Sequence, residues 1–308
     1  MANWKNSEMS TKVIIGTEEM NRRKVAILSG KGGTGKTFVS VNLASVSSPS
    51  TFIDCDAEEP NGHLFFKPQV WRVHKVAVPM PRVNPLLCNG CRKCVDFCAF
   101  HAMAWTSEEL MVFEELCHGC GGCLMVCPND ALSEIHREIG EVREGTSERV
   151  RVLSGFLNTG EASGVPIIKA LLGMQFGKSD NNVFIDCPPG SSCMVSESIH
   201  DADYCVLVAE PTRFGAHNLK MVHELVRLYG KPCGAVLNKC LAGDDPSRDY
   251  CQAQGIPILA QIPFDEELGF LNSNGKIAVR ENERYLMMFQ ELLQEIEMEV
   301  SDAAIGHP

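Results

Sequence analysis

The chain has 308 residues, of which 44% are hydrophobic and 22% are charged, close to the averages of about 45–50% and about 25% for globular domains. This composition excludes a disordered or collagen-like chain, and the length allows one large domain or two ordinary ones. The formal net charge of −11 argues against a broad surface for nucleic acid or acidic lipid, so neither nucleic acid nor a membrane is expected as a partner.

The beginning of the chain carries no recognisable targeting signal. Its first 24 residues lack the apolar run of a signal peptide, and no stretch reaches the roughly 18 apolar residues of a transmembrane helix. We therefore expect a cytoplasmic protein with an N-terminal extension at 1–21. Thiols stay reduced in the cytoplasm, so the 15 cysteines indicate metal binding or catalysis rather than disulfides.

Short apolar runs predict the strands of a mostly parallel sheet. They are rich in β-branched residues and do not alternate with polar ones, which is typical of strands buried on both faces. The runs lie at 25–28, 51–53, 183–185, 204–209, 235–237 and 256–260. Helices are expected between them, notably over 37–45 and 217–229, and an amphipathic helix over 285–300 closes the chain. The predicted fold class is α/β, a sheet flanked by helices.

A glycine-rich loop follows the first predicted strand. The segment Gly30-Lys-Gly-Gly-Thr-Gly-Lys-Thr37 fits the phosphate-binding pattern G-x-x-x-x-G-K-[ST] between a strand and a helix. Its backbone N–H groups would wrap a phosphate, Lys36 would supply charge to the β- and γ-phosphates, and Thr37 would offer its hydroxyl to Mg²⁺. ATP and Mg²⁺ are therefore the expected ligands. The binding residues are Gly30, Gly32, Gly33, Thr34, Gly35, Lys36 and Thr37.

A second lysine in this loop, Lys31, makes it resemble the deviant Walker A class of P-loop ATPases, which includes MinD, ParA and the nitrogenase iron protein. In that class the extra lysine reaches into the ATP site of a partner subunit. The resemblance thus implies an ATP-driven dimer in which Lys31 and Lys36 are catalytic. A solvated loop charge is the alternative for Lys31.

Three acidic residues at strand ends also match this class. Asp54 and Asp56 follow the second predicted strand, and the resemblance implies that Asp56 positions the attacking water while Asp54 supports Mg²⁺. Asp186 ends the third strand and would hold Mg²⁺ through water, before a switch segment at Cys187-Pro-Pro-Gly190. Solvated strand-end acids are the alternative for Asp54 and Asp56.

Two later positions match the adenine site of the class. Asn238, at the end of the strand over 235–237, corresponds to an asparagine that contacts adenine. Pro263 and Phe264 lie where the class frames the ring. A helix cap or a turn is the alternative role for Asn238.

Eight cysteines form a duplicated motif. Cys88-x2-Cys91-x2-Cys94-x3-Cys98 recurs 29 residues later as Cys117-x2-Cys120-x2-Cys123-x3-Cys127. In bacterial two-cluster ferredoxins, three closely spaced thiolates bind one cluster and the fourth cysteine of the run binds the other. The pattern therefore predicts two 4Fe-4S clusters. Their ligands are Cys88, Cys91, Cys94 and Cys127 for one cluster, and Cys117, Cys120, Cys123 and Cys98 for the other.

The cysteine motif predicts an inserted α+β ferredoxin domain. Pro79, Pro81 and Pro85 precede it with few signals of regular structure, and a charged run follows over 137–149. We expect the insert at 79–137, within an ATPase domain formed by 22–78 and 138–300. Structural zinc is the alternative, although its pairs of C-x2-C generally lie further apart. Ala99 follows Cys98 where ferredoxins usually have proline.

An ATPase of this class with a ferredoxin after its second strand resembles the MinD-superfamily ATPases that contain an inserted ferredoxin domain. The resemblance implies ATP-linked iron-sulfur or metallocofactor chemistry. Expected partners are a second copy or a paralogous ATPase, and a redox or metallocofactor client protein. We favour ATP-controlled low-potential electron transfer. Assembly of iron-sulfur clusters or metallocofactors, and a ParA-like adaptor with structural clusters, stay open.

Cys193 is a candidate for a site shared between subunits. It lies seven residues after Asp186, the offset of a cysteine that bridges a cluster in the nitrogenase iron protein. No second cysteine lies over 141–170, so such a site would be labile, and packing in the core is the alternative. Cys55 and Cys187 are expected to pack in the core as well.

Overall fold

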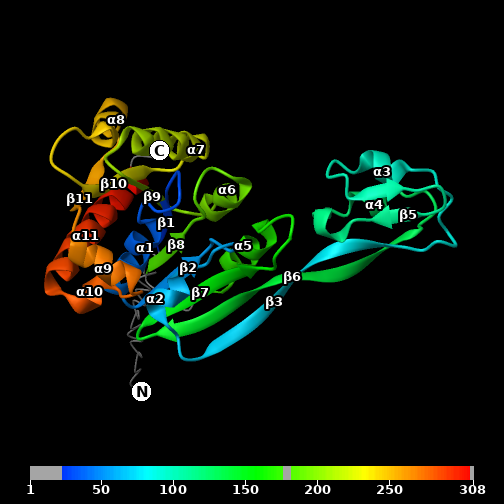
Figure 1. The fold of residues 1–308 in the computed structure, drawn as a ribbon, viewed down its shortest axis with the longest axis horizontal. Coiled ribbons are helices and arrows are strands. Elements are labelled where there is room, and N and C mark those ends of the chain that lie inside the picture. The colour runs from blue at the N-terminus through cyan, green and yellow to red at the C-terminus, as the bar shows by residue number, and fades with distance from the viewer. Residues whose placement is uncertain (1–22, 176–181, 306–308) are drawn as a thin grey trace, which may run out of the picture.

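The computed structural model describes residues 23–175 and 182–305. The body has three layers, a sheet between two groups of helices, and a smaller lobe lies at the end of a long two-stranded extension (Figure 1). The N-terminal extension expected at 1–21 is outside the described residues. Among the helices in these ranges, none combines the length and apolar character that a membrane span requires.

Seven strands of the body are parallel. They are β1 (Arg23–Leu28), β2 (Ser50–Asp54), β7 (Val150–Leu157), β8 (Asn182–Asp186), β9 (Tyr204–Ala209), β10 (Cys233–Cys240) and β11 (Ile258–Pro263). Their order is β11-β10-β9-β1-β8-β2-β7. Alternate residues of a strand are buried against opposite layers of helices, Val25 and Ile27 against one and Ala26 and Leu28 against the other. This double burial explains the unbroken apolar runs and confirms the predicted parallel sheet.

The helices cover both faces of the sheet. One face carries α1 (Lys36–Val46), α2 (Gly62–Phe66), α9 (Glu266–Ser273), α10 (Ala278–Glu281) and α11 (Glu283–Ile305). The other carries α5 (Val165–Leu172), α6 (Cys193–Ile199), α7 (Arg213–Leu228) and α8 (Pro246–Gln254). Helices α1, α7 and α11 confirm the three predicted helices with shifted ends. For example, α7 begins earlier because the Thr212 side chain caps it, accepting a hydrogen bond from Gly215 N at 2.9 Å.

Two long strands connect the body to the lobe. Strands β3 (Trp71–Val83) and β6 (Leu132–Ser147) pair antiparallel along their length, and residues 140–147 of β6 also pair with β7. We call the pair of β3 and β6 the arm, because its base belongs to the sheet and the rest extends away from it (Figure 1). The boundaries expected at 78/79 and 137/138 fall inside these strands, and the division into domains stays a prediction.

The arm corrects the expectation of little regular structure around Pro79 and Pro81. Both prolines lie within β3, which is the last strand of the sheet. One side of an edge strand has no neighbouring strand, so residues whose nitrogen faces that side do not need an N–H group. The nitrogens of residues two positions apart in a strand point to the same side. Pro79 and Pro81 can therefore both direct their nitrogens away from β6, and both remain paired with it.

The lobe at the end of the arm repeats its backbone at the interval of the cysteine motif. We call residues 84–131 the cysteine lobe. It contains α3 (Lys93–Phe97), β4 (Met103–Trp105), β5 (Leu110–Val112), the 3-10 turn η1 (Glu114–Leu116) and α4 (Gly122–Met125). Positive φ angles recur 29 residues apart, at Gly90 and Gly119, Arg92 and Gly121, and His101 and Asp130. The duplication in the sequence is thus also a duplication of conformation.

Strand pairing in the cysteine lobe follows the same repeat. Met103 of β4 pairs with Val112 of β5. At positions 29 residues away from these two, Leu132 of β6 pairs with Val83 of β3. Each pair therefore joins a strand from one half of the duplication to a strand from the other half, so the two halves are interleaved.

The packing of α11 on α1 gives a first test of this fold. Phe289 is fully buried, and its ring centroid lies 5.6 Å from that of Phe38. We expect Phe289→Ala to lower the free energy of unfolding by about 3–5 kcal/mol, because it leaves a cavity in the core. Met287 on the same helix is 54% exposed, so Met287→Ala should change this free energy by less than about 0.5 kcal/mol. Urea unfolding followed by circular dichroism measures both, and equal effects would contradict this packing.

Candidate functional site

A cavity of about 700 Å³ lies where the parallel strands end. The carboxyl ends of such strands are the usual place for a ligand in an open α/β sheet. Of the residues predicted to bind nucleotide or Mg²⁺, or to act on them, the cavity is lined by Lys31, Gly32, Gly33, Thr34, Gly35, Lys36, Thr37, Asp56, Asn238, Pro263 and Phe264. Gly30, Asp54 and Asp186 do not line it. The structure thus brings most of the predicted nucleotide site together.

Two glycines of the loop are required by close contacts. Gly35 precedes α1 with a φ of 96°, a conformation that favours glycine, and a Cβ there would overlap the Asn238 side-chain nitrogen. A Cβ on Gly30 would overlap the backbone carbonyl of Asn218 in α7. The loop is therefore fitted against both α7 and β10, and Gly30 serves packing rather than lining the cavity.

Asp186 is the centre of a buried polar group behind the loop. Its Oδ1 lies 2.6 Å from Lys36 Nζ, and its Oδ2 accepts a hydrogen bond from Thr37 Oγ1 at 2.7 Å. Ser40 Oγ lies 2.9 Å from Oδ1 and also 2.9 Å from the backbone carbonyl oxygen of Lys36, and its hydroxyl can donate to either. Burial alone would lower the pKa of Lys36, but the nearby Asp186 carboxylate outweighs it and raises that pKa. Lys36 therefore stays charged, with Asp186 as its partner.

Ser40 was not among the predicted site residues. It lies one helical turn after Lys36 and so on the same face of α1. A serine at this spacing was the feature of the sequence that could have identified it. Its hydroxyl, together with that of Thr37, remains on Asp186 if Lys36 turns toward a phosphate. The carboxylate would then keep two hydrogen bonds, which reduces the cost of releasing Lys36.

Asp54 contacts backbone rather than the cavity. It is fully buried and accepts hydrogen bonds from Gly62 N at 2.8 Å and from Asp56 N at 3.2 Å. Burial and repulsion from Asp186 raise the pKa of Asp54 to about 8, although Lys36 opposes the shift. Asp54 thus fixes the segment that carries Asp56 and the start of α2. A direct role for Asp54 on Mg²⁺ stays a prediction.

Asp56 faces the cavity. Burial raises its pKa to about 6, and Asp186 adds to the shift while Lys36 opposes it. A carboxyl group with this pKa is mostly ionised at neutral pH. Asp56 can therefore accept a hydrogen bond from a water molecule in the cavity, as expected for a residue that positions an attacking water.

Asn238 holds the loop in this structure. Its Nδ2 donates to the carbonyl oxygen of Thr34 at 2.7 Å, and its Oδ1 accepts from Lys239 N at 2.9 Å. Both polar atoms of the amide are thus bonded to backbone. The contact of Asn238 with adenine, like that of Pro263 with the ring, stays a prediction.

Glu210 and Lys239 belong to the site but were not predicted from the sequence. The Glu210 carboxylate lies 2.6 Å from Lys31 Nζ and 2.7 Å from Lys239 Nζ. Glu210 directly follows β9 and Lys239 lies near the end of β10, so both are at the same edge of the sheet as the loop. The sequence shows an acidic residue after one predicted strand and a basic residue at the end of another, but only the strand order shows that the two side chains are close enough to pair.

The scattered cysteines range from buried through partly buried to exposed. Cys55 and Cys187 are fully buried, and burial raises the pKa of both thiols far above the usual value. Both are therefore packing residues, as expected. Cys193 is exposed at the start of α6, which excludes the alternative that it packs in the core. The shared site at Cys193 stays a prediction.

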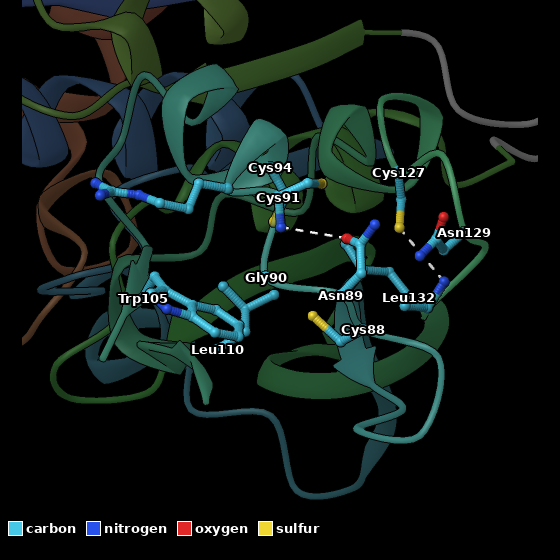
Figure 2. Close-up of a pocket in the computed structure, with 12 residues that line it drawn as sticks. Cys88, Asn89, Gly90, Cys91, Cys94, Trp105, Leu110, Cys127, Asn129 and Leu132 are labelled. Carbon is cyan, nitrogen blue, oxygen red and sulfur yellow. Dashed lines mark hydrogen bonds between the residues drawn. The ribbon is translucent and has the colours of Figure 1, made fainter. Parts of the chain in front are cut away.

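Four of the predicted ligands line a cavity in the cysteine lobe. Figure 2 shows Cys88, Cys91, Cys94 and Cys127 around it. In the other set, burial raises the pKa of Cys123 to about 11, and the neighbouring Cys117 and Cys120 add to the shift. Over the described ranges, no group of three or more His, Cys, Asp or Glu side chains is arranged to hold a metal ion.

Comparison with known families shows what kind of nucleotide site this is. The family model of the CobQ/CobB/MinD/ParA nucleotide binding domain (CbiA) matches residues 25–279. The chain belongs to this family. Its α/β P-loop fold is that of the MinD/ParA ATPases, so the expected nucleotide-binding ATPase class is confirmed.

Individual relatives are similar to this chain over most of its length. The uncharacterized protein MJ0578 of Methanocaldococcus jannaschii is 28% identical over 277 residues, 89% of this chain and 96% of that protein. The uncharacterized ATP-binding protein MJ0823 of the same organism is 24% identical over 255 residues, 80% of this chain and 86% of that protein.

A solved structure with the same fold is the septum site-determining protein MinD of Pyrococcus horikoshii, complexed with Mg-ADP. Its TM-score is 0.54 at 20% identity, covering 89% of this chain and 96% of that chain. At this identity the likeness shows the fold alone.

The two lysines of the loop should separate binding from turnover. Lys36→Ala removes the charge on the β- and γ-phosphates, so we expect ATP affinity to fall at least about 100-fold. Lys31→Ala should leave ATP affinity within about twofold and slow hydrolysis at least about 100-fold. Loss of a cationic side chain that a partner supplies to the transition state has an effect of this size. Isothermal titration and phosphate release measure the two effects. Normal hydrolysis by Lys31→Ala would contradict the deviant Walker A assignment.

Asp54 should make stability depend on pH in the nucleotide-free protein. Its carboxyl group is ionised above about pH 4 when unfolded but keeps its proton to about pH 8 when folded. Between these values unfolding releases a proton, so the free energy of unfolding falls as pH rises, relative to Asp54→Asn, by up to about 1.4 kcal/mol per unit. Urea unfolding of both proteins at pH 5, 6.5 and 8 measures this. A constant difference would contradict the raised pKa.

Proposed function

We propose that this chain is an ATPase whose nucleotide state controls low-potential electron transfer through two 4Fe-4S clusters to a protein partner. The arm is the observation that carries the proposal. Its strand β6 pairs with β7, β7 pairs with β2, and β2 ends at Asp54 next to the nucleotide cavity. The cysteine lobe is therefore joined to the nucleotide site by hydrogen-bonded strands of one sheet.

ATP and Mg²⁺ are the ligands proposed for the cavity at the strand ends. The loop backbone and Lys36 would bind the phosphates, Thr37 would bind Mg²⁺ directly, and Asp186 would bind it through water. Asp56 would orient the attacking water. A relative named as ATP-binding and a neighbour of the same fold solved with Mg-ADP support this assignment. Lys31 implies a dimer with a second copy or a paralogue.

The donor chemistry of the cysteine lobe fits two 4Fe-4S clusters. The cavity in Figure 2 is lined by three cysteines of one half and by Cys127 of the other, which is the three-plus-one set that the spacing predicts. Trp105, Leu110 and Leu132 line the same cavity and would shield a cluster from water. The cavity holds about 20 Å³, so these side chains would move apart on binding. Clusters of this kind accept and release single electrons.

A positioning adaptor is the second candidate. In this function the ATPase cycle would place a partner protein, and the clusters would serve only the structure of the lobe. The solved neighbour of the same fold, named as a septum site-determining protein, favours it. Assembly of clusters or metallocofactors is the third candidate, although outside the cysteine lobe the sequence has no C-x2-C pair of the kind that scaffold ATPases use.

Iron content and oxidation rate test the proposal. We expect anaerobically prepared protein to contain about eight iron atoms per chain and, once reduced, to be oxidised by a viologen dye at a rate that ATP changes by about fivefold or more. Lys36→Ala should remove the effect of ATP and keep the iron. Cys127→Ser should lower the iron content toward about four, whereas Cys240→Ser, at the end of β10 and outside the lobe, should leave it unchanged.

Each candidate function predicts a different result. Protein without iron would contradict the clusters. Eight iron atoms with an oxidation rate indifferent to ATP would favour the positioning adaptor. Transfer of iron to an added apoprotein during ATP turnover would favour assembly. A lower iron content in Cys193→Ser would support a site shared between subunits.

A further inference from the structure

Glu210 binds two lysines with one carboxylate. Its Oε2 lies 2.6 Å from Lys31 Nζ, and its Oε1 lies 2.7 Å from Lys239 Nζ. Lys239 Nζ also donates a hydrogen bond to the carbonyl oxygen of Gly33 at 2.7 Å. The carboxylate therefore connects both lysines and, through Lys239, the backbone of the phosphate-binding loop in the same subunit.

The position of Glu210 is fixed by contacts with the start of α7 and with α8. Its backbone carbonyl oxygen accepts hydrogen bonds from Ser247 Oγ of α8 at 2.6 Å and from Thr212 N at 2.8 Å. The start of α7 packs closely against it, since a Cβ on Gly215 would overlap this carbonyl. Burial alone would raise the pKa of Glu210, but hydrogen bonds from Lys239 and Lys31 lower it overall. A fixed, ionised carboxylate thus directs Lys31 back onto its own subunit.

Lys31 itself is only partly buried. Its side chain is 29% exposed, and its ammonium lies 5.2 Å from the ring centroid of Phe214. A lysine in this position can leave its partner without crossing the protein interior. The pair is thus accessible to an anion supplied from outside the subunit.

We infer that Glu210 is a positioning residue that holds Lys31 on its own subunit until the nucleotide phosphates of a second subunit replace the carboxylate. The inference rests on the proposed ATP-dependent dimer. Because Glu210 has two cationic partners, Lys239 still pairs with it after Lys31 leaves, and no unpaired buried charge remains. The freed ammonium group needs an anionic partner, and the phosphate oxygens of the nucleotide in the second subunit can accept its charge-assisted hydrogen bonds.

A contact made only by the separate subunit opposes dimer formation. The dimer must replace the bond between Lys31 and Glu210 with a bond to phosphate, so the free energy of the first bond is subtracted from that of association. Glu210 thereby sets how much protein and ATP are needed before the dimer forms. Since Lys239 also bonds to the loop backbone, a movement of the loop can shift Lys239 and Glu210 and so alter the bond between Glu210 and Lys31.

The variant Glu210→Gln tests this inference, because it keeps the size of the side chain and removes its charge. In the nucleotide-free chain, we expect the Lys31 amine to react at least about threefold faster with a small acylating reagent, measured by mass spectrometry against the exposed Lys169 as internal reference. With a non-hydrolysable ATP analogue, the dimer should form at about fivefold lower protein concentration. The control is Glu224→Gln, which removes an exposed ion pair to Lys220 on α7 and should change neither the Lys31 rate nor dimer formation.

A double variant separates positioning from a structural role. Lys31→Ala combined with Glu210→Gln should dimerise like Lys31→Ala alone, because the effect of Glu210 passes through Lys31. A gain in dimer formation without Lys31, or an unchanged rate of Lys31 acylation, would overturn the inference. If Glu210→Gln does not fold, Glu210→Asp keeps the charge at shorter reach and should also raise the acylation rate. An unsubstituted chain that never dimerises with ATP would contradict the proposed function, and acylation would still report whether Glu210 holds Lys31.

Discussion

The buried carboxylate of Asp186 is the interaction on which the nucleotide site depends. It accepts bonds from Lys36, Thr37 and Ser40, all on the first turns of α1, while β8 is hydrogen-bonded to both β1 and β2. One charge therefore ties the phosphate-binding loop to the centre of the sheet. Because removal of either partner of a buried pair leaves an uncompensated charge, the residues predicted to bind the nucleotide also stabilise the fold around the loop.

Both lysines of the loop are paired in the same way. Lys36 is paired with Asp186 and Lys31 with Glu210, and each carboxylate has further donors that stay when the lysine leaves. Such pairs keep the lysine ammonium ordered, and the remaining donors reduce the free-energy cost when the lysine leaves its carboxylate. ATP would compete for the first lysine within the subunit. The nucleotide of a second subunit would compete for Lys31. ATP binding and dimer formation would therefore each break a different ion pair.

Sequence reasoning found the residues whose chemistry depends on local spacing. The loop at 30–37 and the paired cysteine runs are recognisable because their members are close in the chain. Glu210 and Lys239 were missed because their meeting depends on β9 and β10 being neighbours, which no local pattern shows. Strand β7 was missed because Arg151 and Gly155 interrupt its apolar run after a charged segment. The strand character around Pro79 was missed because proline is compatible with pairing only at an edge.

The two prolines of β3 also decide how the arm can meet other molecules. An edge strand with free N–H groups invites another chain to extend the sheet, a common start of aggregation. Pro79 and Pro81 remove two successive donors from the outer side of β3. A ribbon of 13 residues, about 40 Å long, is thereby protected along its outer half against strand addition. Side chains rather than strand addition are then what this part of the arm offers to another molecule, and those at its tip belong to the cysteine lobe.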